Sequence, residues 1–187
     1  MREFLHRHFG PGERSLLTLL RWLLVSGLTG VACGLVGAAF YYVVSFVTAA
    51  RQAHGWLLFC LPLAGLFIVW SYRVLGMEND SGTNQIIASV RSGEKPPLRL
   101  ALLIFVSTAL THLTGGSAGR EGAALQIGGS VAASIGRLLR LGERNMNLIV
   151  MCGMSAVFSA LFGTPLSATV FSLEVVSVGI VHYSALF

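Results

Sequence analysis

The chain has 187 residues, of which 54% are hydrophobic and only 11% are charged, and its mean hydropathy is +0.73. Soluble domains carry about 25% charged residues, so this composition excludes an ordinary soluble domain and indicates a protein embedded in lipid. The net charge of +5 comes from basic residues in short joints between apolar runs. That placement is typical of membrane topology signals and excludes the basic stripe of a nucleic-acid-binding protein.

Residues 1–14 are basic, and the apolar run that follows them is too long for the core of a cleaved signal peptide. We therefore expect 1–14 to form a cytoplasmic or interfacial segment ahead of a transmembrane domain at 15–187. The run from Ser15 to about Ala50 is longer than an upright span and predicts a tilted helix. Four glycines at three- and four-residue spacing predict a face on which another helix packs closely. They are Gly27, Gly30, Gly34 and Gly37.

The rest of the chain predicts further helices, one of them too short to cross about 30 Å of hydrocarbon. In chain order they cover Trp56–Tyr72, the short segment 86–97, Leu98 to about Leu113, a helix ending near Arg144, Asn145–Phe162, and Thr164 to about Val181. Proline suits the first turn of the last helix. The expected fold is thus an all-α integral membrane protein.

Two glycine-containing polar joints interrupt the apolar pattern. They are DSGTNQ at 80–85 and GGSAGREG at 115–122, and each stands directly before an apolar helix. Irregular backbone at membrane depth is tolerated only where it is buried in protein or lines a cavity. Broken helices of this kind mark ion or substrate sites in transporters, so the sequence predicts tilted and broken transmembrane helices around such a site.

The second joint carries the residue types of an anion site. Its glycines let the chain turn sharply, and the helix that follows presents free N–H groups and its positive end to the same point. Glu121 stands at that end, where its carboxylate could occupy the anion position and leave it when protonated. The alternative is that Glu121 only pairs with Arg120 or caps the helix. A phosphate-binding loop would need a Lys followed by Ser or Thr.

The first joint and the last helix hold the other polar candidates. Thr83 offers a hydroxyl and Asn84 an amide at the start of the short helix, and both could face an anion. Ordinary capping of that helix by Ser81, Thr83 or Asn84 is the alternative. Glu174 lies in the last apolar run, where it is either a proton-path carboxylate or a residue that reaches the membrane interface.

At these three places the sequence resembles the CLC family of chloride channels and chloride(fluoride)/proton antiporters. GSAGREGAALQIG resembles the GREGP motif and the QIG that follows it, and DSGTNQ lies where the family has GSGIP. GMSAVFSALFGTPLSATVFSLEV resembles the stretch whose core reads N-A-P-L-A-G and ends on paired glutamates. The resemblance covers about 15–187 and implies one half of a CLC-type inverted repeat. It implies gated halide transport by a homodimer with a separate pathway in each subunit.

The resemblance also assigns roles. Glu121 matches the gating glutamate, and Gly119, Arg120 and Gly122 match its loop. Thr83, next to Asn84, matches the serine that contacts the central anion. The implied partners are a halide (chloride or fluoride), protons and membrane lipid.

Several positions depart from the family pattern. Thr83-Asn84 replaces Ser-Gly, Ile86 and Ala123 stand where the motifs have Pro, and Val175 stands where the second glutamate, the inner proton acceptor, is expected. A changed serine site without the inner glutamate is similar to the fluoride/proton antiporter branch. The family's membrane domain is more than twice as long as this chain.

Two other functions compete with transport. One is a membrane assembly subunit or fragment that transports nothing. The other is an intramembrane serine protease using Ser155 and His182, which needs the two side chains within hydrogen-bond reach. Ser155 is followed by Ala, and no partner motif surrounds His182, so we expect no enzyme activity.

No metal or cofactor is predicted. The cysteines, Cys33, Cys60 and Cys152, lie in apolar stretches without metal-type spacing and are expected to be free thiols. The histidines show no paired ligand spacing either; they are residues 6, 8, 54, 112 and 182. The basic N-terminus predicts a multi-pass protein of the cell membrane with its N-terminus in the cytoplasm.

Overall fold

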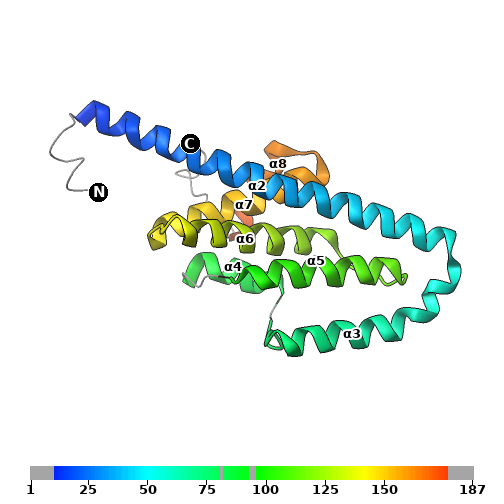
Figure 1. Cartoon of the computed structure of the whole chain (residues 1–187). Coiled ribbons are helices and arrows are strands. Elements are labelled where there is room, and N and C mark those ends of the chain that lie inside the picture. Colours follow the sequence, from blue (N-terminus) through cyan, green and yellow to red (C-terminus); the bar gives the residue numbers. More distant parts are fainter. Residues whose placement is uncertain (1–10, 81, 93–95, 177–187) are drawn as a thin grey trace.

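The computed structural model describes residues 11–80, 82–92 and 96–176. All regular secondary structure in these ranges is helical, which confirms the predicted all-α class (Figure 1). The helices are α2 (Pro11–Ala53), η1 (Gly55–Cys60), α3 (Leu61–Val74), α4 (Thr83–Ser92), α5 (Leu98–Leu113), α6 (Arg120–Leu138), α7 (Glu143–Phe162) and α8 (Pro165–Val176).

The long helix α2 has 43 residues, which correspond to about 65 Å of helix. Because this is about twice the hydrocarbon thickness, α2 crosses the other helices diagonally and its first turns extend past them (Figure 1). The tilt expected from the sequence is therefore present. The helix runs through residue 14 without a break, so the expected division between 1–14 and 15–187 is not marked in the backbone, and residues 1–10 lie outside the described ranges.

Among the described helices, three are long and apolar enough to cross a membrane: Leu16–Ala53, Gly55–Val74 and Asn145–Phe162. Helices α5 and α8 are apolar but shorter. α4 has ten residues, about 15 Å of helix, and enters the bundle without crossing it, as predicted. It begins at Thr83, as expected for the start of the short helix, three residues before the segment 86–97. The predicted end of the last helix near Val181 lies outside the described residues.

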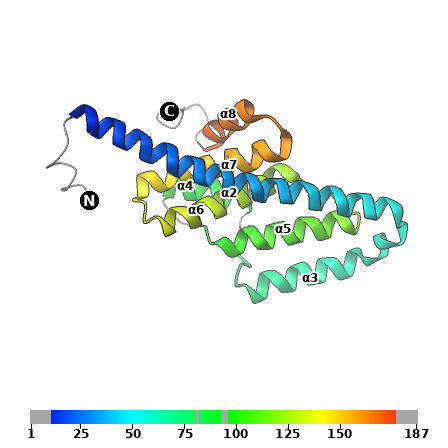
Figure 2. The same ribbon diagram turned by 45° about the horizontal axis from the view of Figure 1, so that its top comes forward.

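Helix α6 forms the centre of the bundle. It packs against α2, α4, α5 and α7, and Figure 2 shows it below α2 and beside α5 and α7. Every residue from Ala123 to Ser130 is buried. A helix that is hidden on all sides needs small residues wherever neighbours approach, and α6 has glycine or alanine at most of these contacts.

The closest helix crossing joins α6 to α7. Gly128 and Gly153 face one another, and a methyl group on Gly153 would overlap the carbonyl oxygen of Gly128 and the Cβ of Ala132. The Cys33 thiol of α2 reaches the same Gly128 carbonyl at 3.9 Å. Three helices therefore meet at one glycine.

The predicted glycine face on α2 is only partly correct. Gly37 packs against α7, because a methyl group there would lie 2.9 Å from the Cβ of Ala160. Gly27, Gly30 and Gly34 have no side chain or neighbouring helix within 4 Å. The fully buried residues on this part of α2 are Thr29 and Cys33, so the three glycines lie beside the helix contact and spacing alone overestimated it.

Helix α3 lies at the edge of the bundle. Ala64 is its one buried side chain, whereas Leu66, Phe67 and Trp70 are exposed. In water such a surface would be unfavourable, but in a bilayer the lipid chains are as apolar as these side chains. The exposed apolar side chains of α3 are therefore consistent with contact with lipid.

Candidate functional site

The start of α4 is shaped by a tight polar turn. Gly82 has φ of +64°, a left-handed conformation that side chains other than glycine adopt at a cost. Its N–H donates to the Asp80 carboxylate at 3.1 Å, which fixes the turn. The helix then begins at Thr83, whose side chain is partly buried, while Asn84 is exposed.

The start of α6 is shaped by the joint Thr114–Gly119, which we call the α5–α6 joint. The chain leaves α5 through Gly115, with φ of +84°, and Gly116 donates back to the Thr111 carbonyl at 2.8 Å. The joint ends in extended backbone at Gly119, the N-cap of α6, and no side chain caps the helix there. The first N–H groups of α6 have no intrahelical acceptor, so they remain available to an anion.

The two helix starts meet. A methyl group added at Gly122 would lie 2.6 Å from the Thr83 hydroxyl oxygen, so the hydroxyl rests against the first turn of α6. Further along, Ile86 packs on Gly129 in the same way. The residue numbers of the two contacts increase in the same direction on both helices, from Thr83 to Ile86 on α4 and from Gly122 to Gly129 on α6. The two helices therefore run parallel, side by side, from neighbouring N-termini. Two positive helix ends therefore lie together.

The Glu121 side chain lies at this meeting point. It is exposed, and one carboxylate oxygen is 3.4 Å from the position that a methyl group on Gly119 would occupy. The carboxylate thus turns back over the N-cap of its own helix. It forms no ion pair with Arg120 and no capping hydrogen bond in the described part of the chain, so neither structural alternative for Glu121 is seen.

Sequence reasoning missed three polar side chains of these two helices that hold buried, unpaired atoms. Gln126 donates to the Gly122 carbonyl at 3.3 Å, but its own carbonyl oxygen is buried without a partner. The Ser130 hydroxyl and the Gln85 carbonyl oxygen are also buried and unpaired in the described structure. Buried polar atoms are normally satisfied by protein or water. The four-residue spacing of Gln126 and Ser130, within a helix of otherwise small and apolar residues, is the sequence pattern that could have indicated two of these side chains.

Glu174 belongs to α8, a helix separate from the two helix starts. It is exposed on the last described turn of α8. Ser155 pairs with the Thr169 hydroxyl at 3.2 Å, while His182 lies outside the described residues. The described cysteines are free thiols, and no group of potential metal ligands occurs in the described residues.

Residues 64–186 match the model of the voltage-gated chloride channel family, which is about two thirds of the chain. This chain belongs to the CLC family. The resemblance found in its motifs is thereby confirmed, and so is the family of its fold. The matched segment begins within α3 and includes both helix starts of the candidate site.

Individual members of the family are similar to this chain over most of its length. The CLC chain is 36% identical over 179 residues to the chloride/fluoride channel protein of Pseudomonas syringae pv. tomato, covering 95% of this chain and 40% of the relative. It is 28% identical over 177 residues to the H(+)/Cl(-) exchange transporter ClcA of Cronobacter sakazakii, covering 84% and 37%. It also resembles the crystal structure of a CLC-type fluoride/proton antiporter, with TM-score 0.83 and 38% identity over 90% of this chain and 43% of that one. The CLC chain spans about two fifths of the length of these relatives.

Proposed function

We propose that the chain provides the N-terminal half of a CLC-type halide transport domain, with Glu121 as a protonatable gate. The observation that carries the proposal is the meeting of the α4 and α6 N-termini at Thr83 and Gly122, with the Glu121 carboxylate beside them. The family membership supports transport rather than catalysis. The same membership supports a homodimer in contact with membrane lipid.

The geometry suits a small anion for electrostatic reasons. Two helix N-termini contribute about half a positive charge each, and their free N–H groups can surround a spherical ion without a strongly hydrated cation at its side. The Thr83 hydroxyl adds a neutral donor. A halide held in this way can still leave, because no full opposite charge binds it permanently. The ionised Glu121 side chain competes for the same donors.

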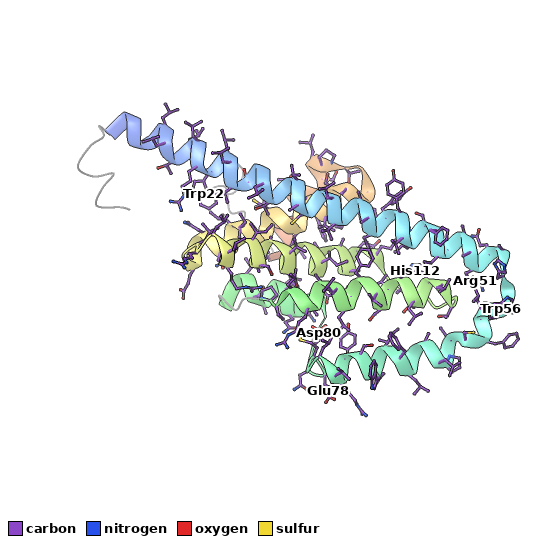
Figure 3. The ribbon with its side chains drawn as sticks, in the orientation of Figure 1. Trp22, Arg51, Trp56, Glu78, Asp80 and His112 are labelled. Carbon is purple, nitrogen blue, oxygen red and sulfur yellow. The ribbon has the colours of Figure 1, made fainter. Side chains whose placement is uncertain are left out.

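The distribution of arginines supports an orientation. Those whose side chains are described lie mainly at the end of the bundle where α2 and α5 begin and α6 ends: Arg21, Arg73, Arg99, Arg137 and Arg140. Trp22 and Trp56 lie at opposite ends (Figure 3), as expected of residues at the two membrane interfaces. By the positive-inside rule we place the arginine-rich end, and with it the N-terminus, in the cytoplasm of a cell.

The ion is chloride or fluoride, and we favour fluoride coupled to protons. This choice rests on the changed serine position at Thr83, on Val175, and on the fluoride named in two of the relatives. The test is efflux of fluoride and of chloride from proteoliposomes of the protein expressed from its complete reading frame, with proton movement recorded in parallel. Halide efflux above that of protein-free vesicles supports transport. Its absence for both ions would favour the alternative, a non-transporting assembly subunit.

Thr83→Val should weaken halide binding or change the order of halide preference. A hydrogen bond to a charged partner contributes about 1.5–3 kcal/mol, which is roughly a 10- to 150-fold change in dissociation constant. Calorimetric titration with each halide measures the effect. Thr48→Val is the matched control, because the Thr48 hydroxyl only donates to the Val44 carbonyl of its own helix at 2.7 Å. Equal affinities in both variants would reduce Thr83 to a helix cap.

A further inference from the structure

Two arginines of the described residues stand at the end of the bundle opposite the arginine-rich end: Arg120 begins α6, and Arg51 lies on the joint before it. Arg51 is in the last turn of α2, close to η1 and to the end of α5. Figure 3 shows it near Trp56 and His112. No carboxylate of the described residues lies within ion-pair distance of Arg51. The positive-inside rule concentrates arginines at the cytoplasmic end, so it does not account for Arg51 at the opposite end.

The Arg51 side chain packs directly on the α5–α6 joint. A methyl group at Gly115 would lie 2.8 Å from its Nε and 3.2 Å from its Nη2. The left-handed backbone and the missing side chain of Gly115 therefore make room for the guanidinium. Leu58 of η1 covers the same point, with its methyl carbon 3.1 Å from that position. Packing holds the guanidinium on the segment that leads to Glu121.

No protein group neutralises this charge in the described structure. The Arg51 Nε is buried without a hydrogen-bond partner, and the described ion pair of the chain, Arg73 with Glu78, lies at the other end of α3. The two histidines at this end face inward to their own helices, since His54 contacts the Ala50 carbonyl and His112 the Thr108 carbonyl. Because packing fixes the guanidinium and no protein group pairs with it in the described structure, its positive charge can attract an anion from outside the protein.

We propose that Arg51 and the α5–α6 joint form an outer capture site for a small inorganic anion. The site concentrates halide at the end of the bundle opposite the N-terminus and delivers it toward the start of α6. Fixed positive charge in a site with low-dielectric walls raises the local anion concentration and its rate of entry. The inference rests on the proposed transport function for its purpose, but the charge itself can be measured without transport.

The first test measures the local potential. Ser117 is exposed in the joint, so Ser117→Cys provides a reporter thiol in a background carrying Cys60→Ser and Cys152→Ser. Its rates of reaction with a sulfonate-bearing and a trimethylammonium-bearing methanethiosulfonate are compared. A unit charge about 8–10 Å away should favour the anionic reagent by roughly three- to tenfold in the rate ratio. Arg51→Gln should lower the rate ratio by this factor, while Arg120 and the start of α6 keep the rest of the preference, and Arg51→Lys should keep the wild-type ratio.

The matched control is Arg99→Gln, which removes the same charge from an exposed position at the arginine-rich end and should leave the ratio at Ser117→Cys unchanged. An unchanged ratio in Arg51→Gln would overturn the proposal. So would a loss in Arg51→Lys as large as in Arg51→Gln, because the arginine would then act only by packing on Gly115. Both results are independent of whether the protein moves halide.

The second test links the site to transport. In proteoliposomes, Arg51→Gln should raise the half-saturating halide concentration on the face opposite the N-terminus about three- to tenfold, and more than on the N-terminal face. The difference should shrink in about 1 M of an impermeant salt, where the Debye length is only about 3 Å. Equal shifts on both faces would contradict a capture site. A wild type that moves no halide would instead defeat the proposed function.

Discussion

Glu121→Gln should abolish coupled proton movement and make halide flux nearly independent of pH. In the proposed mechanism the ionised carboxylate beside the N–H groups of α6 competes with halide and closes the path, and protonation releases it. Wild-type flux should therefore rise as pH falls. Glutamine has nearly the same shape but carries neither the charge nor the exchangeable proton, so the variant should conduct at every pH while its proton flux falls to that of protein-free vesicles.

The assay is paired halide and proton flux from proteoliposomes over a pH series. Glu143→Gln is a matched control, because Glu143 is also an exposed acid in the first turn of a helix that begins after glycine, but it lies at the arginine-rich end. It should retain both the coupling and the pH dependence of the wild type. Retained proton coupling in Glu121→Gln would remove Glu121 as the gate and make Glu174 the next candidate.

Gly153→Ala should destabilise the folded protein by about 1–3 kcal/mol, the range for inserting a methyl group into a packed core. The added carbon would overlap the Gly128 carbonyl oxygen and Ala132. Both belong to the backbone or first carbon of α6, so no flexible side chain can move aside. The helices must separate, and the start of α6 moves with them. Thermal unfolding in detergent, followed by tryptophan fluorescence, measures the loss.

Gly34→Ala provides the comparison for this stability measurement. Gly34 is also inside a long helix, but nothing lies within 4 Å of a methyl group there. Alanine favours a helix over glycine by up to about 1 kcal/mol, so this variant should melt at the wild-type temperature or above it. Equal melting of the two variants would show that the α6–α7 crossing adapts and is not tightly packed.

The sequence was sufficient for most helix boundaries. Apolar runs separated by polar or glycine-rich joints can only be helices in lipid, because every backbone group must pair within its own segment. The predicted span at Leu98–Leu113 is therefore found unchanged, and the helix after Thr164 begins at Pro165. The position of Glu121 in the first turn of α6 was also predictable, since the glycine-rich joint directly before it ends where the apolar helix begins.

The contact between Thr83 and Gly122 could not be predicted from the sequence. The two residues are separated by the whole of α5, and their approach depends on how α4 and α5 pack on α6. Spacing also failed on α2, where only one of four regularly placed glycines meets another helix. Spacing groups residues on one side of a helix, but it does not say whether that side faces the neighbouring helices, and here Thr29 and Cys33 are the fully buried residues between the glycines.

The burial of α6 has a consequence for how the chain enters the membrane. α6 has 19 residues and the longest buried stretch of the described helices, yet it is not among those apolar enough to cross a bilayer by themselves. Its Arg120, Gln126 and Arg137 would each be costly in lipid. During synthesis we therefore expect α6 to remain at the insertion machinery until α7 has been made. The two helices should then enter the bilayer together, packed against each other. Substitutions at the α6–α7 crossing should then lower the yield of inserted protein as well as its stability.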